Sequence, residues 1–369
     1  MDFTVNDINL TLSLYCSTLF FIIVIFNLGF AINKKQESIS NGREFLLFLL
    51  IAVFAVTDFL DGDFFHYKEV VQEFSIFSII DVEEVYLLLI PAIDKNYLLF
   101  RIIIWGGALL FFCLTAKRYT NRYFLSLCTL SFMYLLLFSY ARASLAMCLF
   151  FYGLSYYLKP LRHKYFGWLV GIVFIILSPL FHSSAWAAIA LLPFLFFPIN
   201  KYTIGMIILL FPFLVVISQN ILFPLLLDTS LSNDRMNQKL AGYAVKQKEY
   251  GSAYRLLGTI RYLTFYISLI ILTVVLFFRN NRVKSSCKRL YKMILGIILA
   301  ATVFLFFDLD NLVFYYRILY WAIIPIVFLV TICYIEGYLS KKAYSLIILL
   351  GLFSQGSQCI YEIYCNIVK

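Results

Sequence analysis

The sequence predicts an all-α polytopic integral membrane protein with about twelve transmembrane helices in one transmembrane domain over residues 1–369. The chain is 63% hydrophobic and only 14% charged, and no soluble domain of this length buries so much apolar surface. Apolar stretches such as Leu10 to Ile32 and Leu312 to Ile335 reach the ~20 residues that cross ~30 Å of hydrocarbon. Asp2 and Asp7 precede the first stretch, so a cleavable signal peptide with a basic start is not expected.

The apolar runs place the expected helices between polar loops, most of them short. We expect spans at residues 8–31, 44–60, 97–115, 123–140, 143–158, 165–181, 183–197, 203–223, 259–278, 292–307, 313–335 and 343–361. The turns at 140–142 and 181–184 are so short that the helices on either side should form tight hairpins at the outer surface.

The net charge of +10 is explained by the loops that carry it. With an outside N-terminus, more than half of the Lys and Arg residues fall in cytoplasmic loops, including Lys284, Lys288, Arg289 and Lys292. This is the positive-inside pattern of membrane proteins, so no nucleic-acid partner is expected. The eight cysteines show no spacing typical of metal ligands, and we expect neither a metal site nor a cofactor.

Two outer loops, residues 61–96 and 224–258, are long enough to contain helices of their own. In the first loop, apolar residues recur at helical spacing from Phe64 to Phe77 after Asp63. The pattern Asp81-x-x-Glu84 is typical of a capping box and predicts a second short helix reaching Pro91.

In the second loop, a helix capped by Ser232 or Asn233 would bring Arg235, Lys239 and Lys246 onto one cationic stripe. Two interpretations remain open. The stripe is either a solvated face whose lysines extend toward lipid headgroups, or a grip on an anionic ligand whose tail lies in the bilayer.

Polar residues at helix ends are the best candidates for function, because polar groups are costly near the membrane. Arg142 and His182 occupy the two short outer turns, Arg317 lies about one turn inside a helix, and Asp63 directly follows an early helix. Each also has a structural alternative: an arginine extending to the interface, a satisfied histidine, or a helix N-cap for Asp63.

These residue types suit a lipid substrate that carries phosphate. The planar guanidinium of arginine binds phosphate oxygens in pairs and remains charged, so it can hold a pyrophosphate leaving group. A histidine or an aspartate can accept a proton from an incoming hydroxyl group. The sequence therefore predicts an anion-binding site at the non-cytoplasmic surface.

The order of four short motifs resembles the EpsG-like branch of the Wzy-type polysaccharide polymerases. The motifs are Gly62-Asp63-x-x-x-Tyr67, Arg142-x-x-x-Ala146, Phe181-His-Ser-Ser-Ala185 and Tyr316-Arg317-x-x-Tyr320. The resemblance implies the all-helical architecture of the C-type membrane glycosyltransferases and a location in a bacterial inner membrane. It also implies a periplasmic active site that polymerises O-antigen or another surface polysaccharide of the lipopolysaccharide type.

Such an enzyme transfers a growing glycan from undecaprenyl pyrophosphate onto the non-reducing end of a new lipid-linked repeat unit, without a nucleotide sugar. Carried onto this sequence, the resemblance implies that Arg142 and Arg317 hold pyrophosphate, with help from Arg235, Lys239 and Arg255. His182 is the first candidate for the general base and Asp63 the second. The implied partners are both lipid-linked glycans, membrane lipid and a membrane protein that regulates chain length.

Three alternatives remain open at the level of sequence. A ligase of the O-antigen type would use the same donor and a different acceptor. A flippase or other transporter would place polar groups at the bilayer midplane, often in related halves. A non-catalytic membrane scaffold would have no need of arginines at its outer face.

Overall fold

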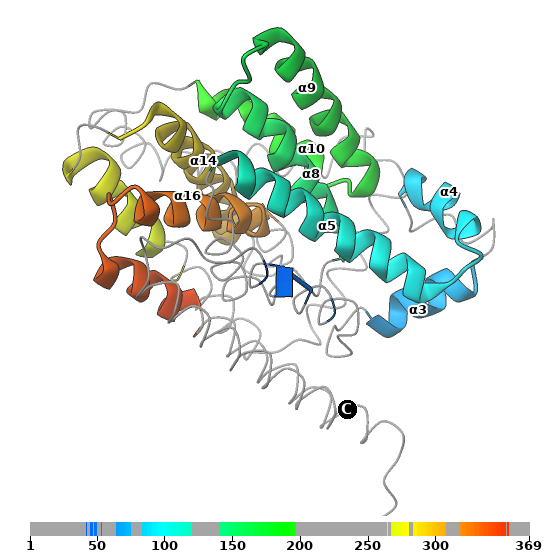
Figure 1. The fold of residues 1–369 in the computed structure, drawn as a ribbon. Helices are drawn as coiled ribbons and strands as arrows, with labels where there is room; N and C mark the ends of the chain where they lie inside the picture. Colours follow the sequence, from blue (N-terminus) through cyan, green and yellow to red (C-terminus); the bar gives the residue numbers. More distant parts are fainter. Residues whose placement is uncertain are drawn as a thin grey trace, which may run out of the picture. The chain divides into compact units, whose positions relative to one another are not determined.

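The computed structural model describes residues 64–74, 83–119, 141–196, 267–279, 283–307 and 318–351, with single positions at 42–53, 264 and 353. The regular secondary structure in these ranges is helical, with no strand among the described residues, in agreement with the predicted all-α class (Figure 1). The principal helices are α3 (Phe64–Gln72), α4 (Glu84–Ala92), α5 (Tyr97–Tyr119), α8 (Ala141–Leu158), α9 (Lys164–Phe181), α10 (Ala185–Ala190), η2 (Leu192–Leu195), η4 (Val274–Arg279), α14 (Ser285–Phe307) and α16 (Ile323–Ile335). Residues 267–273 and 341–351 are also helical.

Three helices within the described ranges are long and apolar enough to cross a membrane: Tyr97–Tyr119, Lys164–Phe181 and Ile318–Ile335. Helix α5 has 23 residues, which corresponds to about 34 Å at 1.5 Å per residue. Leu169, Val173 and Ile176 on α9 are exposed, as expected for a surface that faces lipid. The expected total of twelve spans remains a prediction.

The chain divides into two compact units, one comprising Met1–Trp186 with Val327–Lys369 and the other Ala187–Ile326. The single transmembrane domain expected from the sequence stays a prediction.

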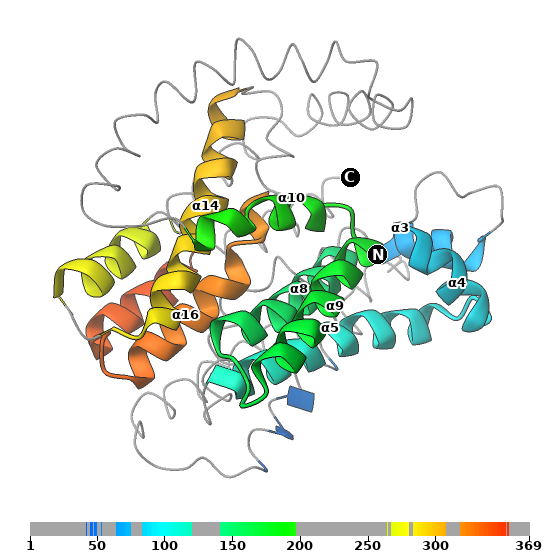
Figure 2. The same cartoon turned by 90° about the horizontal axis from the view of Figure 1, so that it is seen from above.

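Helices α5, α8 and α9 form the centre of the first unit and lie side by side in two perpendicular views (Figures 1 and 2). Helices α5 and α8 run in the same direction, because Phe111 packs on Tyr152 and Arg118 lies over the ring of Tyr156. Helix α9 runs antiparallel to α8. In this pair, Tyr152 packs on Phe174, and Tyr157 stacks on Trp168 closer to the connecting turn.

Two glycines allow α8 and α9 to approach closely. A Cβ atom on Gly153 would lie 2.6 Å from the carbonyl oxygen of Gly171, and one on Gly171 would lie 2.8 Å from that of Gly153. Small residues allow such backbone contact between helices in membranes, where packing rather than hydrophobic burial drives association. The contact fixes the register of the α8–α9 hairpin.

The C-terminal part of the first unit packs on α5 through the ring of Phe328. Phe112 stacks on Phe328 with ring centroids 4.8 Å apart. Within the C-terminal part, Tyr334 stacks on Tyr344 at 4.2 Å. Arg101 is buried in α5, where its Nη1 donates to the hydroxyl of Tyr97 at 3.3 Å.

Two of the expected spans, which lie largely in the second unit, differ from the structure. The span at 183–197 is not one helix: α10 ends at Ala190 and is followed by the 3₁₀ helix η2, because Pro193 has no N–H to donate to Ile189. The span expected at 292–307 begins earlier, at Ser285. Lys288 and Arg289 therefore lie on the first turns of α14 and not in the expected loop.

Close side-chain packing holds this unit together. The ring of Phe194 lies against Gly296, where an added Cβ would be 2.9 Å from the ring. Thr273 and Tyr291 share a hydrogen bond of 2.5 Å between their hydroxyl groups.

Candidate functional site

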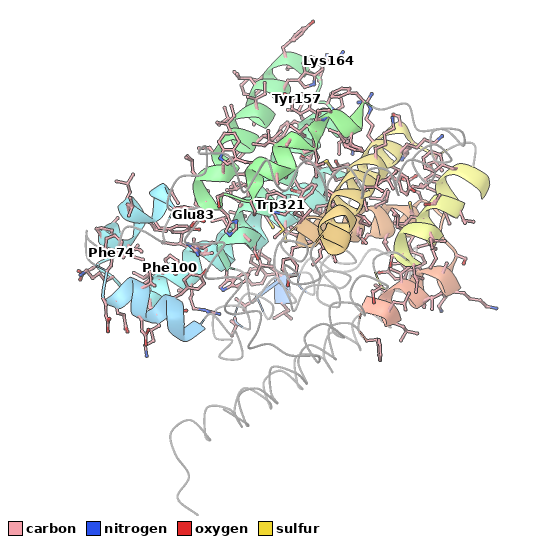
Figure 3. All side chains as sticks on the ribbon, turned by 180° about the vertical axis from the view of Figure 1, so that it is seen from behind. Phe74, Glu83, Phe100, Tyr157, Lys164 and Trp321 are labelled. Atoms are coloured by element: carbon pink, nitrogen blue, oxygen red, sulfur yellow. The ribbon has the colours of Figure 1, made fainter. Side chains whose placement is uncertain are left out.

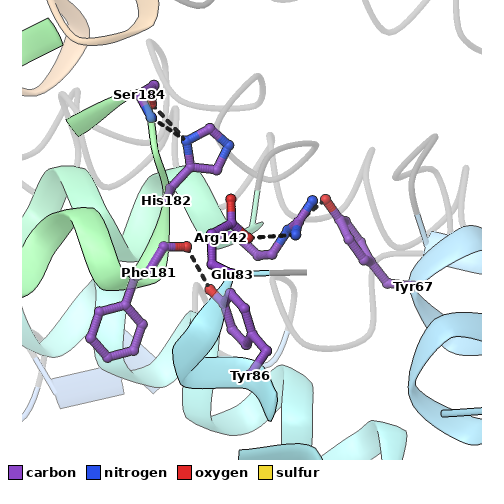
Figure 4. A network of polar contacts seen from close by, with 7 residues as sticks. All are labelled: Tyr67, Glu83, Tyr86, Arg142, Phe181, His182 and Ser184. Atoms are coloured by element: carbon purple, nitrogen blue, oxygen red, sulfur yellow. Dashed lines mark hydrogen bonds and ion pairs between the residues drawn. The ribbon is translucent and has the colours of Figure 1, made fainter. Parts of the chain in front are cut away.

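A network of polar contacts joins α3, α4, the first turn of α8 and the last turn of α9 at one end of the first unit (Figure 4). The basic residues Lys117 and Lys164 lie at the other ends of α5 and α9. Figure 3 shows that the network and these basic residues lie at different ends of the unit, with Glu83 and Phe100 at one end and Tyr157 and Lys164 at the other.

Arg142 is the centre of this network. Its Nε donates to the hydroxyl of Tyr67 at 2.9 Å, and its Nη1 donates to Oε2 of Glu83 at 2.6 Å. The guanidinium carbon lies 4.8 Å from the ring centre of Tyr67 and 5.8 Å from that of Tyr86. Short charge-assisted hydrogen bonds and aromatic faces both favour a cation, so these contacts fix the orientation of the guanidinium.

Glu83 is positioned by the first turn of α4. It is the N-cap residue of this helix, with φ −65° and ψ 154°, but its side chain makes no capping hydrogen bond. The carboxylate binds Arg142 instead, and the two side chains are only 16% and 18% exposed. The first unit thus contains a partly buried ion pair within the candidate site.

Tyr86 connects this ion pair to the end of α9. Its fully buried hydroxyl donates to the carbonyl oxygen of Phe181 at 3.1 Å, and its ring meets the ring of Phe181 edge-on. Burial raises the pKa of the Tyr86 phenol well above its usual value, although the charge of Arg142 acts in the opposite direction. The phenol therefore stays protonated and supplies a donor to a helix-end carbonyl that has no partner within its own helix.

His182 directly follows Phe181 and ends α9 in an extended conformation, with φ −161° and ψ 125°. Its Nδ1 accepts a hydrogen bond from the backbone N–H of Ser184 at 3.2 Å and lies 2.7 Å from the hydroxyl of the same serine. The imidazole is half-buried and is held by the turn that leads into α10.

The structure brings Arg142 and His182 to the same end of the first unit, where Tyr86 contacts both Arg142 and the residue before His182 (Figure 4). The other predicted site residues lie outside the described residues, so their place in the site stays a prediction. They are Asp63, Arg235, Lys239, Arg255 and Arg317.

Glu83 and Tyr86 were not predicted as site residues. The short helix was predicted correctly up to Pro91, but its cap was not: α4 begins at Glu84 after the N-cap residue Glu83, later than the Asp81 pattern implies. Helix α3, at Phe64–Gln72, confirms the first part of the apolar spacing expected from Phe64 to Phe77. Phe74 lies after the end of the helix, and Phe77 lies outside the described residues. Tyr67 belongs to the motif Gly62-Asp63-x-x-x-Tyr67, and the acidic pair at the start of α4 was the further signal in the sequence.

Within the described part of the chain, no three His, Cys, Asp or Glu side chains are grouped so that they could hold a metal ion. The chemistry available in this network comes from one guanidinium, one carboxylate, an imidazole and tyrosine hydroxyls. Such a set can bind an anion and exchange a proton.

The sequence matches the model of the EpsG family over residues 43–355, and the chain therefore belongs to this family. The family is associated with glycosyltransferase-like polysaccharide polymerase activity, and the match together with the apolar helices indicates a membrane protein. No curated protein and no solved structure matches the sequence significantly.

Proposed function

We propose that this protein polymerises undecaprenyl-pyrophosphate-linked oligosaccharide repeat units at the periplasmic face of a bacterial inner membrane. In this reaction the growing glycan is transferred from its lipid carrier onto the non-reducing end of a new repeat unit. Membership of the EpsG family supports the polymerase role. The observation that carries the proposal is the joint position of Arg142 and His182 around Tyr86 at one end of the bundle.

The distribution of charge supports the orientation. Lys117, Arg118, Lys159 and Lys164 lie at the end of the α5, α8 and α9 bundle that is opposite to Arg142. Positive residues concentrate on the cytoplasmic side of membrane proteins, which favours a periplasmic position for the site. The acceptor and the donor would then reach the site from the same leaflet, with their isoprenoid chains in lipid.

Arg142 would hold the diphosphate of the donor. Its guanidinium carries a permanent charge, and Tyr67 and Tyr86 orient it before substrate arrives. Charge develops on the diphosphate as the bond from the anomeric carbon to its oxygen breaks, and a preorganised cation stabilises that charge. Arg317, Arg235, Lys239 and Arg255 remain the further candidates for this role.

The transfer needs one proton acceptor. The acceptor hydroxyl oxygen forms a bond to the anomeric carbon, the bond to the diphosphate oxygen breaks, and the hydroxyl proton passes to a base of the protein. The sequence predicts His182 or Asp63 as that base. Undecaprenyl pyrophosphate leaves with the electron pair of the broken bond, so atoms and charge balance without a further reactant.

A polymerisation assay with purified protein and lipid-linked repeat units tests the proposal. We expect Arg142→Ala to reduce the glycan ladder by about 10²–10³-fold, because one charge-stabilising group is lost. Arg142→Lys should recover only part of the activity, because it keeps the charge but loses the planar fork.

The matched control is Arg162→Ala, an exposed arginine in the turn between α8 and α9 at the opposite end of the hairpin. Its ladder should equal that of the parent. A full ladder from folded Arg142→Ala protein would remove Arg142 from the mechanism. A single transfer without a ladder in the parent would identify a ligase-type reaction in place of polymerisation.

A further inference from the structure

The hydrogen bonds of His182 define which of its ring nitrogens carries the proton. The backbone N–H of Ser184 donates to Nδ1 at 3.2 Å. A backbone N–H can only donate, so Nδ1 must offer its lone pair. The hydroxyl of Ser184, 2.7 Å from the same nitrogen, can then donate its own hydrogen to Nδ1.

A neutral imidazole has one N–H group, and its position is set by the bonds of the other nitrogen. With Nδ1 accepting from Ser184, the proton of neutral His182 belongs on Nε2. A proton on Nδ1 would face the N–H of Ser184 directly and would eliminate that hydrogen bond. The turn at the end of α9 therefore selects the Nε2–H tautomer.

This tautomer is unsuited to accept a proton from the acceptor hydroxyl. Its one basic nitrogen, Nδ1, is engaged by the serine two residues later in the chain. The other nitrogen already carries a hydrogen and can only donate. Figure 4 shows the two ring nitrogens on opposite sides, with one toward Ser184 and the other on the side where the Arg142 guanidinium lies.

We propose that neutral His182 donates a hydrogen bond from Nε2–H to an anionic oxygen of the diphosphate leaving group. This inference rests on the proposed polymerase function and separates two tasks within it. Arg142 supplies positive charge to the diphosphate and His182 supplies a neutral, directional donor. The proton of the acceptor hydroxyl then passes to a carboxylate, for which Asp63 is the candidate from the sequence.

The tautomer can be measured without any substrate. The chain has three histidines, so solid-state nitrogen NMR of histidine-labelled protein in lipid bilayers gives few signals. The His182 signals are those that disappear in His182→Gln. We expect an unprotonated Nδ1 and a protonated Nε2 at neutral pH. A protonated Nδ1 would overturn the assignment.

The catalytic role is tested with two amides of different length. The amide of His182→Gln can place an N–H near the position of Nε2, whereas the shorter His182→Asn reaches only the position of Nδ1. We expect His182→Gln to keep kcat within about ten-fold of the parent, and His182→Asn and His182→Ala to lose about 10²–10³-fold, as when one oxyanion donor is removed. His163→Gln is the matched control, because His163 is exposed at the start of α9.

The activity assay and the NMR measurement test different parts of the proposal. Equal loss of activity in folded His182→Gln and His182→Ala would overturn the donor role, even if NMR shows the expected tautomer. Absence of any ladder from the parent protein would overturn the proposed function, while the NMR result would still decide the tautomer.

Discussion

Replacing Glu83 by glutamine separates the structural role of the Arg142 ion pair from its effect on an anionic substrate. Glutamine keeps the shape of the side chain and an acceptor oxygen, but removes the negative charge that lies 2.6 Å from Nη1. Hydrogen bonds to charged groups contribute about 1.5–3 kcal/mol, roughly twice the neutral value. We therefore expect Glu83→Gln to lower the free energy of unfolding by about 1–2 kcal/mol.

The same substitution should strengthen the binding of the diphosphate donor, although it destabilises the fold. A diphosphate that binds Arg142 comes close to the Glu83 carboxylate and competes with it for the guanidinium. Two unit charges about 5 Å apart at an effective dielectric constant of 20 repel each other by about 3 kcal/mol. If hydration leaves only a third of this repulsion, Glu83→Gln still binds the donor about five-fold more tightly.

Two measurements on the same protein test this reasoning: thermal unfolding in detergent, and binding of undecaprenyl pyrophosphate at low and high salt. The gain in affinity should shrink at high salt, because added ions screen the repulsion. Glu69→Gln is the matched control, since this exposed residue of α3 carries the same charge outside the network. Weaker donor binding in Glu83→Gln would refute the competition and would leave Glu83 as a residue that only positions Arg142.

Two further substitutions test how the site is held. Gly153→Ala places a Cβ 2.6 Å from the carbonyl oxygen of Gly171, so the two helices must separate. We expect this change to lower the free energy of unfolding by about 1–3 kcal/mol, measured by thermal unfolding. Gly106→Ala is the control and should leave the stability unchanged, because an added Cβ there has nothing within 4 Å. Tyr86→Phe removes the donor to the Phe181 carbonyl and should cost about 1–2 kcal/mol, with a change in the nitrogen NMR signals of the adjacent histidine. Unchanged unfolding in Tyr86→Phe would show that this hydrogen bond does not hold the end of α9.

The main helices were predictable because their signals are local. The expected spans at 97–115, 143–158 and 165–181 correspond to α5, α8 and α9 with shifts of a few residues. Length and apolar character determine such helices in lipid, where each backbone N–H must be satisfied within its own segment. The same local signal explains the confirmed helices on either side of Glu83.

The errors arose where one residue type permits two structures. Lys288 and Arg289 were interpreted as loop residues because of their charge, yet lysine and arginine are good helix formers and extend their charged ends away from an apolar surface. Pro193 was placed inside a continuous span, although a proline in a helix removes a backbone donor and disrupts the preceding turn.

Arg142 and His182 were predictable as candidates because polar residues at short outer turns are costly and few. Their partners were not predictable, since these contacts join distant parts of the chain. Glu83 binds a residue 59 positions away, and Tyr86 binds one 95 positions away. No periodicity in the sequence connects such pairs, and a buried tyrosine resembles any other core aromatic until its hydroxyl partner is known.

The α8–α9 hairpin explains why Arg142 and His182, 40 positions apart in the sequence, lie at the same end of the two helices. Arg142 precedes Gly153 by eleven residues, and His182 follows Gly171 by eleven residues. The helices are antiparallel and touch at these two glycines, so an equal rise of about 16 Å carries both residues toward the same end. The equal spacing is present in the sequence, but it acquires meaning only when the structure shows which glycines meet. The hairpin register therefore sets the geometry of the candidate site, and the ion pair with Glu83 and the bond from Tyr86 secure it.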